Sequence, residues 1–152
     1  MTVADRLLCG TTARWLAAVA RCAGALGLGA AALAALALLM LPAPRVITTM
    51  GFLAVLLISL AERLLALRLV FDAGLFADLA DRDAHGDAPV TFASLDAALQ
   101  ALGLRRAPAA TRGLLERIAG ARRLSLQHLA VVLAQVALLA AALLAQQMGS
   151  RP

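Results

Sequence analysis

The sequence predicts an all-α membrane protein in which three transmembrane helices are joined by a short turn and by a helical cytoplasmic segment. Three observations support this prediction: an excess of apolar residues, three long uncharged runs, and arginines sorted to one side of those runs. Of 152 residues, 62% are hydrophobic and 15% are charged, whereas soluble chains have about 45–50% and about 25%. A soluble domain of this size cannot bury so much apolar surface. The composition therefore excludes intrinsic disorder, a disulfide scaffold and an ordinary aqueous enzyme domain.

The first predicted span, residues 23–41, is a run of 19 uncharged residues, close to the roughly 20 that cross a bilayer as a helix. Pro42 and Pro44 follow and stop the helix, so residues 42–45 form an external turn. A cleavable signal peptide is the alternative, but no Ala-x-Ala site precedes these prolines. We therefore expect a retained first span.

Residues 1–22 precede this span and carry Arg6, Arg14 and Arg21 on one helical face, with Trp15 on the opposite face. This pattern predicts an amphipathic helix that lies on the cytoplasmic leaflet. A disordered basic tail is the alternative. The helix is favoured because tryptophan suits the headgroup level of a membrane.

The second predicted span begins with the uncharged residues 46–61, which make about 24 Å of helix. That length is short for a hydrocarbon core of about 30 Å. We therefore extend the span through Glu62 and Arg63 to residue 67, giving a span at 46–67. The Arg63 guanidinium then reaches outward to the interface.

The rest of the chain is divided by a third uncharged run, residues 124–145, which we predict to be the third span. Residues 68–123 before it form the cytoplasmic segment, and residues 146–152 after it form an external tail. Within the segment we expect the second helix to continue to about residue 80. Glycine and proline then separate two further helical pieces, at 94–102 and from residue 111 into the third span.

Arginine placement predicts the orientation of these spans. All 14 basic residues are arginine, and only Arg45 and Arg151 lie on the opposite side from the other 12. Because basic residues stay in cytoplasmic loops, we expect a cytoplasmic N-terminus and an external C-terminus. Arginine without lysine is typical of a GC-rich bacterial genome, so we expect the bacterial inner membrane. The formal charge of +5 then reflects orientation, and we expect no nucleic-acid partner.

Small residues in the first span predict close helix packing. Ala23 and Gly27 form one pair at a spacing of four, and Ala25 and Gly29 form another. Such pairs let two helix backbones approach closely within a membrane. We expect these four residues to mark a packing surface.

The extension after the second span carries a seam with heptad-like spacing: Leu65, Leu69, Asp72, Phe76 and Leu79. Apolar residues also cover the remaining faces of this stretch, so it requires burial on more than one side. Two interpretations remain open, packing against the chain's own cytoplasmic helices and packing against a partner or a second copy. We favour the partner or second copy, because so few aromatic residues make a thin independent core.

Polar residues in the third span form a stripe, since His128, Gln135 and Gln146 share one helical face. Polar groups in hydrocarbon require partners, so this face is expected to meet protein or water. Hydrogen bonding between helices is the favoured interpretation, and an ion or proton path is the alternative. Glu62 and Arg63 are expected to form an ion pair at the membrane boundary.

Candidate ligand sites are few. Five arginines before the third span are expected to attract anionic lipid: Arg105, Arg106, Arg112, Arg122 and Arg123. Residues 81–87 resemble the start of a calcium-binding EF-hand loop, but Phe92 stands where the bidentate glutamate is required. Phosphate-binding, hydrolase and zinc motifs are absent from the sequence. We therefore expect no cofactor, no metal and no enzyme activity.

The function expected from these patterns is that of a small accessory or scaffolding subunit in the inner membrane. It would act through helix–helix packing with other membrane protein subunits or with copies of itself. The alternative is a homo-oligomeric pore or transport component that uses the polar face of the third span.

Overall fold

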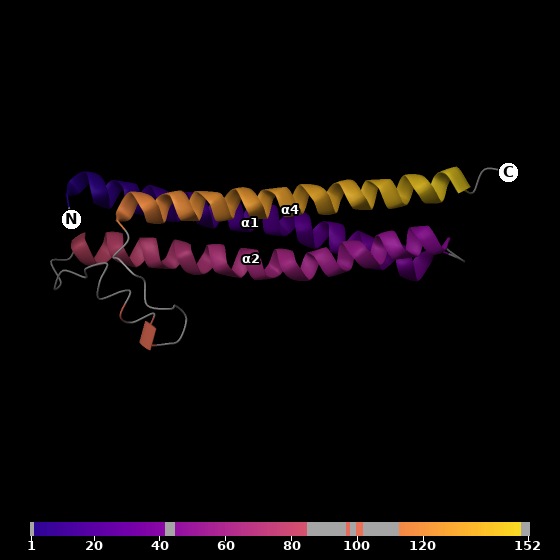
Figure 1. Ribbon diagram of the computed structural model, residues 1–152, viewed down its shortest axis with the longest axis horizontal. Coiled ribbons are helices and arrows are strands. Elements are labelled where there is room, and N and C mark those ends of the chain that lie inside the picture. The colour runs from indigo at the N-terminus through magenta and orange to yellow at the C-terminus, as the bar shows by residue number, and fades with distance from the viewer. Residues whose placement is uncertain (1, 42–44, 85–96, 98–99, 102–112, 150–152) are drawn as a thin grey trace.

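The computed structural model consists of three long helices that lie side by side as an elongated bundle (Figure 1). It describes residues 2–41, 45–84, 97, 100–101 and 113–149. Helix α1 is Val3–Met40, α2 is Val46–Ala84 and α4 is Leu114–Gly149. The chain runs along α1, returns along α2, and runs along α4 in the same direction as α1. We call the end with the α1–α2 connection the hairpin end and the opposite end the far end.

All three helices are long and apolar enough to cross a membrane. The prediction of an all-α chain with three such helices is therefore confirmed over the residues that the structure describes. Helix α2 continues to Ala84, slightly beyond the expected residue 80. The expected helical piece at 94–102 lies outside the described residues, apart from 97, 100 and 101, which are helical.

Helix α1 begins with a capping box. The Thr2 hydroxyl accepts a hydrogen bond from the Asp5 backbone N–H at 3.1 Å, and the Asp5 carboxylate accepts one from the Thr2 N–H at 3.0 Å. These bonds satisfy donors that a helix start otherwise leaves unpaired. They also hold the pKa of the Asp5 carboxyl below its ordinary value of 3.8. The helix ends at Met40, where Leu41 takes an extended conformation before the first proline.

The amphipathic helix expected within residues 1–22 is the first half of α1 and not a helix of its own. Helix α1 passes without interruption from these residues into the apolar run. Its small and apolar face, Cys9, Ala13, Leu16 and Ala20, is buried in the bundle. The arginines on the other face had suggested a helix lying flat on lipid. That face remains exposed here, because the opposite face packs against α2 and α4.

Two apolar cores hold the ends of the bundle together, and each takes residues from all three helices. The hairpin-end core consists of Ala30, Ala34, Phe52, Val55, Leu139 and Ala142. The far-end core consists of Cys9, Ala13, Leu16, Ala20, Leu69, Ala73, Phe76, Ala121 and Leu124. Between these cores lie polar side chains of α2 and α4, which contact one another and two backbone carbonyls of α1.

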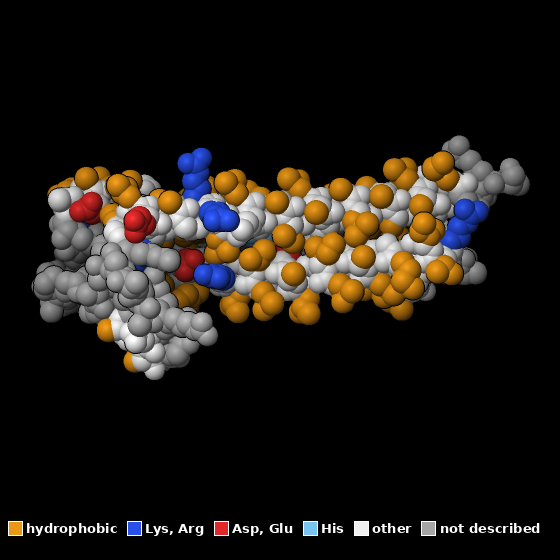
Figure 2. Space-filling model, in the orientation of Figure 1, with side chains coloured by type: hydrophobic (Ala, Val, Ile, Leu, Met, Phe, Trp, Pro, Cys, Tyr) orange, Lys and Arg blue, Asp and Glu red, His pale blue; other side chains and the backbone are white. Residues whose placement is uncertain are grey.

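The outer surface of the bundle is itself apolar. Hydrophobic side chains cover the visible face along most of its length, whereas acidic side chains gather toward the far end (Figure 2). Large exposed side chains occur on every helix, including Leu33, Leu57 and Leu133. A surface of this kind suits a hydrocarbon environment rather than water.

Candidate functional site

A buried acid–base pair joins α2 to α4 between the two cores. Glu62 and His128 are both 0% exposed. The His128 Nε2 atom lies 2.8 Å from the Glu62 Oε1 atom. A buried charge or polar group is tolerated only when it is paired, and each of these two side chains supplies the partner that the other requires.

Arg63 connects this pair to α1. Its Nε atom lies 3.1 Å from the Glu62 Oε2 atom, and its Nη2 atom donates a hydrogen bond of 2.6 Å to the Gly24 carbonyl. The expected ion pair between Glu62 and Arg63 is therefore confirmed. The Arg63 side chain remains 42% exposed, so one guanidinium reaches both the buried carboxylate and the outer surface.

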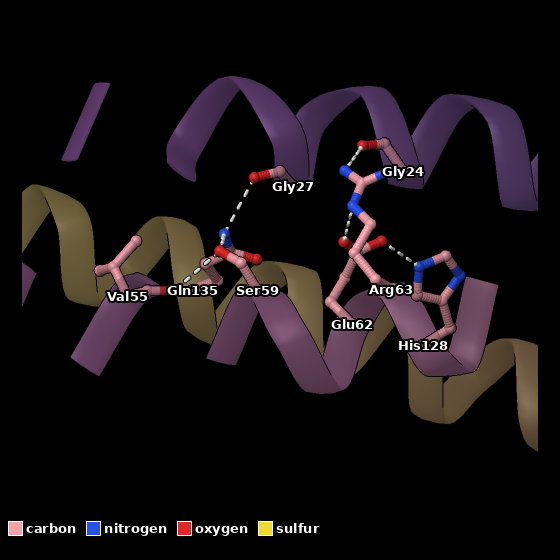
Figure 3. Close-up of polar contacts among 8 residues, drawn as sticks. All are labelled: Gly24, Gly27, Val55, Ser59, Glu62, Arg63, His128 and Gln135. Atoms are coloured by element: carbon pink, nitrogen blue, oxygen red, sulfur yellow. Dashed lines mark hydrogen bonds and ion pairs between the residues drawn. The ribbon is translucent and has the colours of Figure 1, made fainter. Parts of the chain in front are cut away.

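Gln135 makes a second connection between the helices. Its Nε2 atom donates to the Gly27 carbonyl of α1 at 2.9 Å and to the Ser59 hydroxyl of α2 at 2.7 Å. Ser59 in turn donates to the Val55 carbonyl at 2.8 Å. We call this set of side chains the polar clasp: Ser59, Glu62, Arg63, His128 and Gln135 (Figure 3). Together they tie all three helices at one level of the bundle.

Gly27 of α1 makes room for the clasp, whereas the nearby Gly24 is not required for space. A Cβ atom at Gly27 would lie 2.9 Å from the Glu62 carboxyl carbon, a distance that real Cβ atoms do not tolerate. At Gly24 it would lie 3.8 Å from both Glu62 and Arg63. Of the two predicted small-residue pairs, Ala23 and Gly27 face inward. Ala25 and Gly29 are exposed, so the second pair does not pack in this bundle.

Some buried atoms of the clasp have no hydrogen-bond partner in the structure. They are Glu62 Oε2, which has only the ion pair with Arg63, His128 Nδ1 and Gln135 Oε1. The His128 Nε2 atom faces the Glu62 carboxylate, so a hydrogen bond between them requires the ring proton to be on Nε2. Among the described residues no group of three His, Cys, Asp or Glu side chains is placed to hold a metal ion.

The third member of the predicted polar stripe, Gln146, lies away from the clasp. It is half-buried near the end of α4, and its Oε1 atom has no partner. Thr48, near the start of α2, is also buried with an unpaired hydroxyl. The hairpin-end core separates this level from the clasp. The stripe therefore meets protein, as expected, but its polar residues fall into two separate levels.

The predicted seam after the second span packs inside the bundle. Leu69 and Phe76 belong to the far-end core, Leu65 packs against it and Leu79 is buried. Of the two interpretations of this seam, packing against the chain's own helices is the one that the structure shows. Asp72 is half-buried, and burial raises the pKa of its carboxyl above the ordinary 3.8, while Arg68 opposes this rise.

The opposite face of the same stretch of α2 stays uncovered. Leu64, Leu67, Val70 and Phe71 are exposed, with Leu67 at 68%. Beside them a cleft of about 200 Å³ lies between α2 and α4, with Phe76 and Leu124 in its wall and Arg68 and Glu116 among its polar lining.

The predicted lipid-binding arginines divide into two groups. Arg122 and Arg123 are exposed on α4. Arg105, Arg106 and Arg112 lie outside the described residues.

The sequence did not indicate that Glu62 pairs with His128. It also did not indicate that the Ser59 hydroxyl and the Gly24 carbonyl accept hydrogen bonds from the clasp. The available signal was that Glu62 is an acid next to an apolar run and that a polar stripe in the third span required partners.

Comparison of the chain with protein-family models, curated proteins and solved structures finds no match in any of the three.

Proposed function

We propose that this protein is a non-catalytic membrane subunit that acts as an accessory or scaffolding component through helix–helix packing. The observation that carries the proposal is the uncovered apolar face of α2, formed by Leu64, Leu67, Val70 and Phe71. We call it the outer α2 face. The partners we propose are other membrane proteins or further copies of this chain.

The position of this face argues that lipid tails alone do not cover it. At about 1.5 Å per residue, Leu67 and Phe71 lie about 32 Å and 38 Å from the hairpin end of α2. A hydrocarbon core is about 30 Å thick. The apolar side chains at the far end of the face therefore extend into the headgroup region, where each exposed Å² costs about 25 cal/mol.

The shape of the face suits another helix. Large exposed side chains recur along α2 at alternating spacings of three and four: Met50, Leu53, Leu57, Leu60, Leu64, Leu67 and Phe71. Side chains at this spacing form a ridge that fits the groove of a neighbouring helix. The polar side chains of the clasp contact one another and α1 inside the chain's own bundle, whereas the side chains of this ridge are apolar.

The alternative of a homo-oligomeric pore has less support. A pore requires polar side chains that face water, but His128 and Gln135 are fully buried among the chain's own helices. Phe52 and Val55 of the hairpin-end core lie between the clasp and that end of the bundle. Flux of ions through liposomes that contain the purified protein, lost in Gln135→Leu, would reverse this preference.

The test of the scaffold proposal is photo-crosslinking in native membranes. A photoreactive phenylalanine analogue is placed at Phe71, and a matched one at Leu115, which is also exposed at the far end but on α4. We expect a discrete protein adduct from position 71, either a second copy or another membrane protein, and none from position 115. Lipid adducts alone from position 71, or the same adduct from both positions, would contradict the proposal.

A further inference from the structure

Exposed arginines form a band around the bundle at the far end of its apolar surface. They occur on all three helices: Arg14, Arg21, Arg63, Arg68, Arg122 and Arg123. We call them the arginine collar. We infer that the collar binds the headgroups of anionic phospholipids, and that Arg63 transmits this binding to the polar clasp.

The level of the collar matches the headgroup region of a bilayer. Counted from the hairpin end at about 1.5 Å per residue, Arg63 lies at about 26 Å and Arg14 at about 39 Å. Gln135 fixes the level of α4, since it bonds both Gly27 and Ser59, and each of those lies at about 20 Å. On this scale Arg123 lies at about 38 Å. Hydrocarbon ends at about 30 Å, and headgroups fill the next several Å.

The charge of this band is strongly one-sided. Among the described residues between these levels, the acids are Glu62, which is fully buried, and Asp72, which is half-buried. The outer surface therefore presents six guanidinium groups with little acidic compensation. Guanidinium binds phosphate through paired hydrogen bonds, and Trp15, which is partly exposed at this level, suits the same interface.

Arg63 differs from the other five arginines because it also belongs to the clasp. Its Nε and Nη2 atoms are engaged by Glu62 and the Gly24 carbonyl, while 42% of the side chain is exposed. A phosphate bound on the exposed edge holds the guanidinium in place against the buried carboxylate. Anionic lipid outside the bundle is thereby linked to the Glu62–His128 pair inside it.

The test compares the melting temperature of the full chain in two kinds of vesicle, pure phosphatidylcholine and an equal mixture with phosphatidylglycerol. We expect the mixture to raise the melting temperature by about 5 °C, as a ligand that binds only the folded state does. In about 1 M salt, where the screening length is about 3 Å, most of this rise is lost. The measured quantity is the difference between lipids, so a variant's general loss of stability cancels.

The variants separate the two parts of the inference. Arg122→Gln and Arg68→Gln each reduce the lipid-dependent rise, and Arg63→Gln reduces it most, because that residue alone contacts the clasp. Arg45→Gln, at the hairpin end and outside the collar, is the matched control and reduces the rise less than any collar variant. An equal loss in Arg45→Gln, or no rise in the wild type, overturns the collar. An equal loss in Arg63→Gln and Arg68→Gln overturns the link to the clasp.

A last arm distinguishes lipid from free anion. Inorganic phosphate is added to pure phosphatidylcholine vesicles at the concentration of anionic lipid used above. No change in melting temperature is expected. The arginines of the collar lie at one level, where a membrane concentrates its headgroups, so they bind lipid phosphates more strongly than free phosphate at the same concentration. A rise as large as that with phosphatidylglycerol would assign the collar to a soluble phosphate and overturn lipid binding.

Discussion

Helix α2 carries polar side chains on its inward face and apolar side chains on its outward face, the reverse of the usual pattern in water-soluble proteins. The inward face contains the half-buried Ser59 and the fully buried Glu62, while the outward face is a row of exposed leucines. Helix α1 shows the same contrast, with Ala23 and Gly27 inside and Leu26 and Leu33 outside. In lipid, apolar side chains gain nothing by facing each other rather than the hydrocarbon. Polar groups and small residues therefore decide which face turns inward.

Removal of Glu62 is the strongest way to test this contrast. Glu62→Ala leaves the buried His128 without its partner and takes the counter-ion from Arg63. We expect the free energy of unfolding in mild detergent to fall by about 3 kcal/mol, as for other broken buried pairs. Glu116→Ala, an exposed acid on α4, is the control. A small, equal loss of stability in both variants would show that the clasp contributes little to which face of α2 turns inward.

Substitution of Gly27 tests the role of close approach. Gly27→Ala brings a methyl group to 2.9 Å from the Glu62 carboxyl carbon, so the carboxylate must leave His128 or the helices must separate. We expect a loss of about 1–3 kcal/mol, typical of overpacking, measured by thermal unfolding. Gly29→Ala, with no atom within 4 Å, should be neutral or stabilising, because alanine favours the helix. Similar losses in the two variants would contradict the inward assignment of Gly27.

Loss of the Gln135 hydrogen bonds should have a smaller effect. Gln135→Leu removes the hydrogen bonds to the Gly27 carbonyl and to Ser59. It fills the same position with an apolar side chain of similar size. Interhelical hydrogen bonds in membrane bundles contribute about 0.6 kcal/mol each, so we expect a loss of about 1 kcal/mol. The exposed Gln127→Leu provides the matched control, with no loss. An increase of stability in Gln135→Leu would show that burial of the amide outweighs its bonds.

The smallest expected effect concerns Asp72, at the edge between the two faces. Burial raises the pKa of its carboxyl in the folded protein above the ordinary 3.8. The folded state therefore holds this proton more tightly than the unfolded state. The contribution of Asp72 to stability is then greatest below pH 3.8 and declines as the pH rises through the raised pKa. Asp72→Asn should remove this decline, a change of less than about 1 kcal/mol, measured by unfolding at several pH values. If the pH dependence of stability were the same in Asp72→Asn and the wild type, the raised pKa of the Asp72 carboxyl would be contradicted.

Much of the fold follows from the order of residues along the chain. The three uncharged runs predicted α1, α2 and α4, and the two prolines predicted that α1 ends close before them, as it does at Met40. The spacing of His128 and Gln135 predicted that both face protein or water, and both are buried among the helices. These predictions succeed because the length and apolarity of a helix, and which residues share one of its faces, depend on local composition and spacing.

The seam at Leu65–Leu79 was harder to interpret. Its spacing predicted burial but not the identity of the covering surface, and the sequence reasoning favoured a partner. The covering residues, among them Cys9 and Leu16, come from a part of α1 that had been expected to lie on the leaflet. Because α1 is one continuous helix, its first half lies beside this seam and covers it. The two expectations are therefore linked, because the placement of the first half of α1 decides what covers the seam.

Composition and spacing by themselves determined that this chain forms long apolar helices and that its arginines gather toward one side. The tertiary structure alone decided that Glu62 meets His128, 66 residues away, and that Arg63 meets Gly24, 39 residues away. The rotation of each helix about its axis selects these pairs. In lipid that rotation is set by a few polar contacts and close approaches rather than by overall hydrophobicity, and such contacts form only when all three helices are in place.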